Sequence, residues 1–342
     1  MTTTTDRHPV AAPTSQANPA RTLRAVFANQ QVILLLVLVG MIVVFSVLNP
    51  VFFSVDVFAN ILLDWGPVIL IAIAQTFVIV SGGIDLSVGA TIALSGVVAA
   101  FAMQGAVTAK MSDTGAILIG VAVAAVTGVA VGFANAFLIN TAKLVPFIAT
   151  LATLGAAGGL AIVLTGGAPV GGGPASAIAL SVPWLGPLST PGIVVVVITI
   201  IAGLYLHKSR FGRYTYAIGS NPFAALAAGI NVKRHLTKVY VLSGLLSGLA
   251  GMFLYIRLGS GAPTSGVGNE LDAIAAVVIG GASLMGGVGR MTGTVIGALI
   301  LTTVTSGLII IGVEPNWKKV VVAILIAAAV SLQAVRKSAR KA

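Results

Sequence analysis

The sequence predicts an all-helical protein that crosses a membrane many times, and two observations support this fold class. Hydrophobic residues make up 57% of the 342 residues, whereas only 8% are charged. A soluble domain needs roughly 25% charged residues to keep its surface in water. The hydrophobic residues also form about ten runs, each near the ~20 residues that a helix needs to cross a bilayer. Lipid must therefore solvate much of the surface.

The runs occupy residues 32–48, 66–81, 86–104, 116–139, 144–165, 191–206, 238–257, 272–285, 291–311 and 319–334. We expect each to be a transmembrane helix. The sixth and eighth are short, and Gly280 and Gly281 interrupt the eighth. The alternative is that one or both are partial or re-entrant helices, so a count of eight or nine spans stays open. A membrane domain over 31–335 would follow a polar, disordered cytoplasmic leader, 1–30, and precede a basic cytoplasmic tail, 336–342.

Lysine and arginine gather between the runs, and their distribution predicts the topology. If the N-terminus is cytoplasmic and the spans alternate, 15 of the 19 basic residues fall inside and 4 outside. This is the positive-inside pattern of membrane proteins, and it places both termini in the cytoplasm. It also accounts for the net charge of +11 without a nucleic-acid partner. The acidic residues expected outside are Asp56, Asp64, Asp113, Glu270, Asp272 and Glu314.

The side chains that enzymes need are missing from the predicted spans. The sequence has no cysteine, and its histidines (His8, His207 and His235) lie in the leader or in one loop. It has no Gly-x-x-x-x-Gly-Lys-Ser/Thr motif for nucleotide phosphates, and no His-Glu-x-x-His motif or acidic pair for a metal. We therefore expect no catalytic residue, metal or cofactor. The spans are also nearly free of ionisable groups, so the energy for transport would come from another protein.

Glycines spaced by four residues predict close helix packing, because they lie on one helix face and let backbones approach. They are Gly128/Gly132, Gly155/Gly159, Gly244/Gly248 and Gly289/Gly293/Gly297. Neutral polar residues inside the runs are candidates for a solute path, or for hydrogen bonds between helices. They are Gln75, Thr76, Asn135, Ser243, Ser247, Thr302, Thr303, Thr305 and Ser306.

The longest loop between runs, 207–238, is predicted to contain a short helix. Asn221 suits the N-cap, Pro222 the first helical position, and Gly229 the left-handed position that ends a helix. An apolar helix outside the bilayer favours a docking surface for another protein; a helix lying on the inner leaflet is the alternative. We expect its small apolar face, with Ala225, to contact the partner, so that a charge there would leave the fold intact.

The segment Ser81-Gly-Gly-Ile-Asp-Leu-Ser-Val-Gly89 predicts a break after the second run. Gly82 and Gly83 interrupt the helix, and Asp85, with Ser87 beside it, can cap the next one. Freed backbone groups at membrane depth must line protein or a water-filled cavity, so the segment is either a gate for an uncharged polar solute or a plain turn. It matches residues 280–287 at four of eight positions, through an internal duplication or by coincidence.

Three stretches together resemble the permease subunits of ATP-binding cassette (ABC) importers of the ribose/xylose/galactose type. They are residues 81–89, the pattern Ala-Ile-Gly-Ser-Asn-Pro-x-Ala-Ala-x-x-x-Gly-Ile of the loop, and residues 279–297, in the order of that family. The resemblance covers about residues 32–334 and implies a type II-like importer permease fold. It implies import of a monosaccharide, and the alternatives are a polyol, a furanone-type signal or a stand-alone carrier or channel.

The resemblance also implies partners and site residues. The partners are a second permease copy, a cytoplasmic ABC ATPase that hydrolyses the ATP, a periplasmic sugar-binding protein, and the lipid of a bacterial inner membrane. The implied coupling residues are Gly219, Asn221, Pro222, Ala224, Ala225 and Gly229. For the translocation path and gate, the candidates are Gly82, Gly83, Asp85, Ser87, Gln75, Asn135, Thr302 and Ser306.

Overall fold

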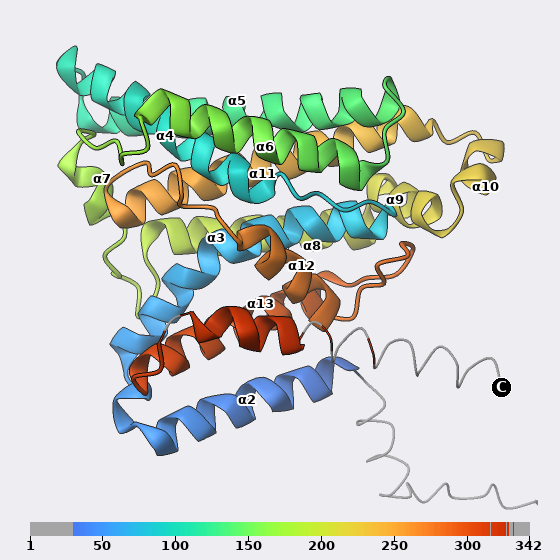
Figure 1. Cartoon of the computed structure of the whole chain (residues 1–342). Helices are drawn as coiled ribbons and strands as arrows, with labels where there is room; N and C mark the ends of the chain where they lie inside the picture. The colour runs from blue at the N-terminus through green and yellow to red at the C-terminus, as the bar shows by residue number, and fades with distance from the viewer. Residues whose placement is uncertain (1–29, 315, 326, 328–330, 332–342) are drawn as a thin grey trace, which may run out of the picture.

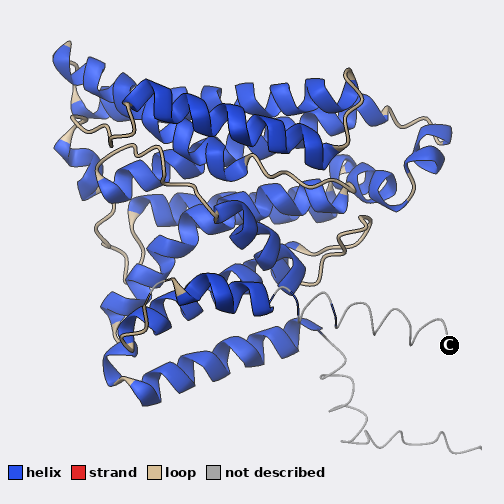
Figure 2. Cartoon of the chain, in the orientation of Figure 1, coloured by secondary structure: helices blue, strands red, loops and turns tan. Residues whose placement is uncertain are grey.

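The structure, a computed structural model, describes residues 30–314, 316–325, 327 and 331. Within these ranges the chain is helical, and its β-structure is limited to two isolated bridges (Figure 2). The predicted all-helical class is therefore confirmed. The predicted leader, up to residue 29, and the predicted tail, 336–342, lie outside the described residues.

Eight described helices are long and apolar enough to cross a membrane, and they run side by side across Figure 1. They are α2 (Gln30–Leu48), α3 (Val55–Val80), α4 (Val88–Thr108), α5 (Asp113–Asn140), α6 (Pro146–Thr165), α8 (Thr190–Lys208), α11 (Val232–Leu258) and α13 (Met291–Ile310). They correspond to the first seven predicted runs and the ninth. The short sixth run is thus a complete helix, α8.

Short elements mark the two ends of the bundle. The helices α9 (Arg210–Ser220) and α10 (Pro222–Ala227) lie at the right of Figure 1. We term this the basic end, because the loop 207–238 carries Lys208, Arg210, Arg213, Lys233, Arg234 and Lys238. The helix α7 (Ala175–Ala179) lies at the opposite end, and the 3-10 turn η1 (Pro50–Phe52) joins α2 to α3.

The eighth predicted run, 272–285, is not a complete transmembrane helix. The helix found there, α12 (Asn269–Ile279), has 11 residues. Its length of ~16 Å is about half of the hydrocarbon core of a bilayer. It begins in the middle of the bundle and ends toward the basic end (Figure 1). Glycines and turns shorten it: Gly280 ends it, and a non-helical stretch, 259–268, precedes it. The tenth run is helical over 317–325 and lies partly outside the described residues.

Helix α3 is the central helix, and it is longer than predicted. All its residues from Trp65 to Val80 are buried, and it packs against α8, α11, α12 and α13. It begins at Val55 rather than near residue 66, because polar residues lower the hydropathy of its first turns without ending the helix. One of them, Asp64, forms an ion pair with Arg257 of α11.

Close glycine contacts join α5 to α11 as predicted. Gly128 and Gly132 face Gly244 and Gly248 of α11. A Cβ added to Gly128 would lie 2.1 Å from the carbonyl oxygen of Gly244, and the converse distance is the same. Only glycine lets these two backbones approach so closely.

The other predicted glycine contacts differ in outcome. Gly293 and Gly297 of α13 lie directly against the backbone of α12, with added Cβ atoms 2.0 and 2.1 Å from its carbonyl oxygens. Within the described chain the prediction for Gly155/Gly159 is wrong, because no atom of another described element lies within 4 Å of either added Cβ. The spacing places two glycines on one helix face, but it does not place a second helix against that face.

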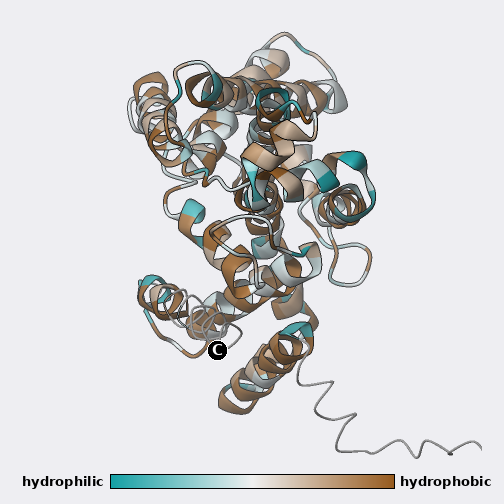
Figure 3. Cartoon of the chain, turned by 90° about the vertical axis from the view of Figure 1, so that its right-hand side faces the viewer, coloured by the Kyte–Doolittle hydropathy of each residue, from teal (hydrophilic) through white to brown (hydrophobic). Residues whose placement is uncertain are grey.

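Hydrophobic residues dominate the outer helices as well as the inner ones, as the brown ribbons of Figure 3 show, and many of their large side chains are exposed. Val126 of α5 is 68% exposed and Ile200 of α8 is 59% exposed, although each lies near the middle of its helix. Such side chains are stable on the outer surface only against lipid or against another protein. The chain is therefore a multi-pass membrane protein.

Candidate functional site

The loop 207–238 contains the predicted capped helix, α10. The side-chain oxygen of Asn221 accepts hydrogen bonds from the backbone N–H groups of Phe223 and Ala224, both at 3.0 Å. Gly229 follows the helix with a φ of +81°, a left-handed conformation that favours glycine. Asn221, Pro222 and Gly229 thus occupy the predicted cap positions, and their coupling role stays a prediction.

Helix α10 exposes its large apolar side chains and buries a small one. Phe223 is 83% exposed and Leu226 is 61% exposed, whereas Ala225 is only 4% exposed. A charge at Ala225 would therefore be buried inside the chain itself. The expectation that this position contacts a partner and tolerates a charge is wrong, because α10 turns that side toward its own bundle.

The three motif segments meet at the basic end of α3. The N–H of Gly287 donates a hydrogen bond to the carbonyl oxygen of Val80 at 2.9 Å. Gly219 of α9 lies against both groups: an added Cβ would be 1.8 Å from the Val80 oxygen and 2.7 Å from the Gly287 nitrogen. A Cβ added to Gly286 would lie 2.7 Å from the carbonyl oxygen of Gly219 and 3.0 Å from the Cα of Gly82. No side chain separates these segments, so α9 packs backbone to backbone on the end of α3.

Side chains hold α9 on both sides. The hydroxyl of Tyr216 donates a hydrogen bond to the carbonyl oxygen of Gly289 at 2.7 Å. Burial raises the pKa of Tyr216 above its ordinary value, so the hydroxyl stays protonated and can donate. The hydroxyl of Thr215 and Nε2 of His235, in α11, are hydrogen-bonded at 2.9 Å. These bonds connect α9, and through it the exposed α10, to the segment before α13 and to α11.

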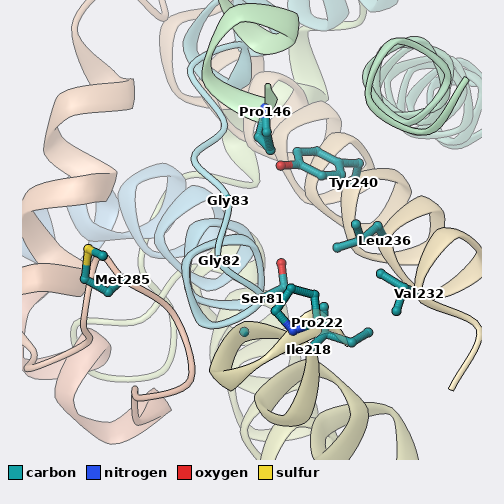
Figure 4. Close-up of a pocket in the computed structure, with 11 residues that line it drawn as sticks. Ser81, Gly82, Gly83, Pro146, Ile218, Pro222, Val232, Leu236, Tyr240 and Met285 are labelled. Carbon is teal, nitrogen blue, oxygen red and sulfur yellow. The ribbon is translucent and has the colours of Figure 1, made fainter. Parts of the chain in front are cut away.

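A cavity of about 280 Å³ lies beneath α10 (Figure 4). Gly82 and Gly83 line it, together with Pro222 and Tyr240. A Cβ on Gly83 would lie 2.4 Å from the Tyr240 hydroxyl. That hydroxyl is buried and has no hydrogen-bond partner in the part of the chain that the structure describes. The sequence analysis missed Tyr240, because a tyrosine inside an apolar run carries no distinguishing signal.

Asp85 is the centre of a buried hydrogen-bond network. One carboxyl oxygen accepts from the N–H and the hydroxyl of Ser87, at 2.9 and 2.6 Å, and the other accepts from Ser243 of α11 at 2.7 Å. The Ser87 oxygen accepts from the Asn135 amide of α5 at 2.8 Å, and Asn135 accepts from Thr153 of α6. The network joins Asp85 and Ser87, which the sequence nominated together, to Asn135, which it nominated separately.

The network also corrects the predicted cap of α4. The N-cap residue is Ser87, and its side chain makes no capping bond to the helix. The Asp85 carboxylate accepts a hydrogen bond from the N–H of Ser87, which is the N-cap residue and precedes the first turn of α4 by one position. The segment 82–87 is therefore held by contacts with α5, α6 and α11 rather than by α4 alone.

The turns after α3 and α12 have the same backbone geometry. Gly82 and Gly281 are left-handed, with φ of +88° and +94°. In each turn the N–H of this glycine donates to the carbonyl oxygen three residues earlier in the chain. The N–H of the following residue donates to the carbonyl oxygen five residues before it, and all four distances are 2.9 to 3.1 Å. The structure thus pairs Gly82 with Gly281, whereas the sequence match pairs it with Gly280. The two segments share a helix ending, but its register is displaced by one position from the match of residues 82–89 with 280–287, so the shared ending does not account for the four matching positions.

The remaining predicted path residues line neither the cavity beneath α10 nor a second cavity, which lies between α4, α6 and α12. Gln75 is 0% exposed, and neither atom of its amide has a partner among the described residues. Thr302 donates to the carbonyl oxygen of Ala298 in its own helix at 3.1 Å, so it does not join two helices. Ser306 is 7% exposed. Of the predicted path residues, Gly82 and Gly83 alone line either cavity.

A second cavity, of about 130 Å³, lies between α4, α6 and the start of α12, and we term it the α4–α12 cavity. Glu270 lines it. Glu270 and Asp272 were expected outside the membrane, but both lie in the first turn of α12, inside the bundle. Asp272 accepts from Lys318 at 2.7 Å. The expected outer location of these two residues is thus wrong, because α12 begins at mid-bundle. The described residues hold no cluster of three or more metal-ligating His, Asp or Glu side chains.

Fold and site together define a multi-pass membrane transport subunit, with a short helix that exposes apolar side chains on one end and no cluster of metal-ligating side chains in the described residues. The chain belongs to the family described as branched-chain amino acid transport system / permease component, which matches residues 57–330. The resemblance to importer permeases is thereby confirmed, and the chain is a transport subunit rather than an enzyme.

Individual relatives cover most of the chain. The ribose import permease protein RbsC of Escherichia coli K12 is 41% identical over 301 residues, which are 86% of this chain and 91% of the relative. RbsC of Bacillus subtilis is 43% identical, over 85% and 89%. The D-allose transport system permease protein AlsC of Escherichia coli K12 is 35% identical, over 86% and 89%. No solved structure matches the chain, so the type II-like subclass stays a prediction.

Proposed function

We propose that the chain is the membrane-spanning permease subunit of an ABC importer that moves a monosaccharide across a bacterial inner membrane. The sugar is supported by relatives named for ribose and D-allose, and by the fructose import permease protein FrcC of Rhizobium meliloti, at 37% identity over 89% of this chain. A polyol or a furanone-type signal would use the same machine. A stand-alone carrier or channel is disfavoured, because it has no use for an exposed apolar helix.

The observation that carries the proposal is α10, whose Phe223 and Leu226 are exposed while α9 connects it to the end of α3. In the proposed complex, the basic end and both termini face the cytoplasm, where α10 docks on the ATPase. A shift of α10 would be passed through Gly219 to the turn at Gly82. A second permease copy and a periplasmic sugar-binding protein complete the importer.

The test replaces the exposed apolar side chains of α10. Phe223→Glu and Leu226→Glu place an unpaired charge in the proposed interface, which costs several kcal/mol and is enough to break it. We expect normal amounts of permease in the membrane, with loss of ATPase co-purification and of sugar uptake. Leu144→Glu is the matched control, since Leu144 is 37% exposed in the loop between α5 and α6.

Two results would count against the proposal. If both α10 variants retain the ATPase and uptake at the level of the control, α10 lies on the lipid surface and is not the docking helix. If the unsubstituted chain takes up no monosaccharide beside its ATPase and binding protein, the substrate class is wrong.

A further inference from the structure

The turns before α12 place polar side chains at membrane depth. Gly266 lies against Gly89, in the first turn of α4. From this point α4 runs toward the end of the bundle that holds α7, whereas α12 runs toward the basic end (Figure 1). The contact therefore lies between the two ends of the bundle. The backbone over 263–268 is non-helical. The side chains that are exposed or half-buried there include Thr264, Ser265, Val267, Asn269, Glu270 and Leu271. Non-helical backbone is not stable against lipid tails; it occurs at this depth only inside protein or along a water-filled cavity.

Glu270 differs from the other carboxyl groups near it. Asp272 pairs with Lys318 and Asp64 pairs with Arg257, but no ion pair to Glu270 occurs among the described residues. Its carboxyl group occupies the space that a side chain at Gly89 would fill. Glu270 belongs to the first turn of α12, and its carboxyl group faces the first turn of α4. The free N–H groups at the start of both helices favour an electron-rich group at this position.

The other residues that line the α4–α12 cavity are small or apolar. They are Gly89, Ala90, Ala93, Leu154, Gly158, Pro263 and Val267. Glu270 is the one polar side chain in this lining. A carboxyl group beside an apolar wall suits a solute that has hydroxyl donors on one edge and C–H groups on its faces, which describes a sugar.

We infer that residues 263–271 line the water-filled translocation path of the importer, and that Glu270 binds the hydroxyl groups of the sugar on this path. This inference rests on the proposed function and adds the residue that contacts the substrate. It gives the neutral substrate a hydrogen-bond acceptor at mid-membrane, where an unpaired carboxyl group would otherwise be costly.

Water access is tested first, with a readout that does not depend on transport. The chain has no cysteine, so single cysteines can be introduced without background. Val267 and Val126 are matched in residue type and are 76% and 68% exposed. A charged methanethiosulfonate reagent reacts with thiolates, which form in water. In assembled importer in membrane vesicles, we expect Val267→Cys to react at least about tenfold faster than Val126→Cys. Equal rates would overturn the inference.

Sugar contact is tested with Glu270→Ala and Glu270→Gln, and with the exposed Glu314→Gln as control. Uptake of D-ribose, D-allose and D-fructose by the complete importer is measured. We expect Glu270→Ala to lower uptake by about tenfold or more, because it removes a hydrogen bond to a charged group. For Glu270→Gln the loss is smaller, since the amide keeps an acceptor.

A second readout separates sugar contact from a structural role of Glu270. Saturating sugar should slow the labelling of Val267→Cys in the native background, but not in the Glu270→Ala background. The labelling rate without sugar should stay within about twofold in both, as expected for an intact fold. Normal uptake by both Glu270 variants would overturn this inference alone, whereas absence of uptake by the unsubstituted chain would refute the proposed function.

Discussion

At the scale of single residues, the site depends on glycines that have backbone atoms on two sides. Gly219 is the clearest example, because the carbonyl of Val80 and the N–H of Gly287 leave no room for a Cβ. Both neighbours are backbone atoms inside packed segments, so neither can rotate away. The close packing of Gly219 against these backbone atoms explains the need for glycine at this position better than contact with a partner does.

We predict that Gly219→Ala destabilises the chain by about 1–3 kcal/mol, the usual cost of overpacking. Gly155→Ala is the matched control, since no atom lies within 4 Å of its added Cβ. Alanine in a helix interior should be neutral or stabilising by up to about 1 kcal/mol. Thermal unfolding of the purified chains in detergent measures both. Equal melting temperatures for the two variants would show that α9 does not pack as described.

At the scale of elements, α10 has only six residues and depends on its caps. Asn221→Ala removes the acceptor for two N–H groups and should cost about 1 kcal/mol of local stability. Gly229→Val should act through backbone strain alone, because no atom lies within 4 Å of its added Cβ and its φ is +81°. We expect faster amide hydrogen exchange over 222–228 in both variants, and unchanged exchange in α11.

The short helix α12 shows why hydropathy alone does not define a span. Its apolar run continues into 280–285, but left-handed Gly281 turns the chain away from the helix axis. The stretch that completes the crossing, 259–268, is built from glycines and turns that lie against α4. Such a stretch has no periodicity to detect, so its place at mid-membrane was not predicted.

At the scale of the whole molecule, the charge partition makes a prediction about topology. Ser220 ends α9 and Gly172 lies three residues before α7, and these two helices lie at opposite ends of the bundle (Figure 1). Reporter fusions at Ser220 and at the C-terminus should report the cytoplasm, and a fusion at Gly172 should report the outside. An outside signal at Ser220 would invert the proposed orientation and, with it, the docking role of α10.

The sequence by itself determined the helical membrane class, the positions of eight spans, the caps of α10 and the family. These features depend on composition and on contacts between near neighbours in the chain. The tertiary structure decided which side chains meet: Ala225 turned inward, Gly155/Gly159 without a neighbour, and Asp85, Ser87 and Asn135 joined in one network. It also moved Glu270 and Asp272 from the predicted outer surface into the bundle. The physical reason is that these contacts join residues far apart in the chain, and the periodicity of one helix does not specify the face of another.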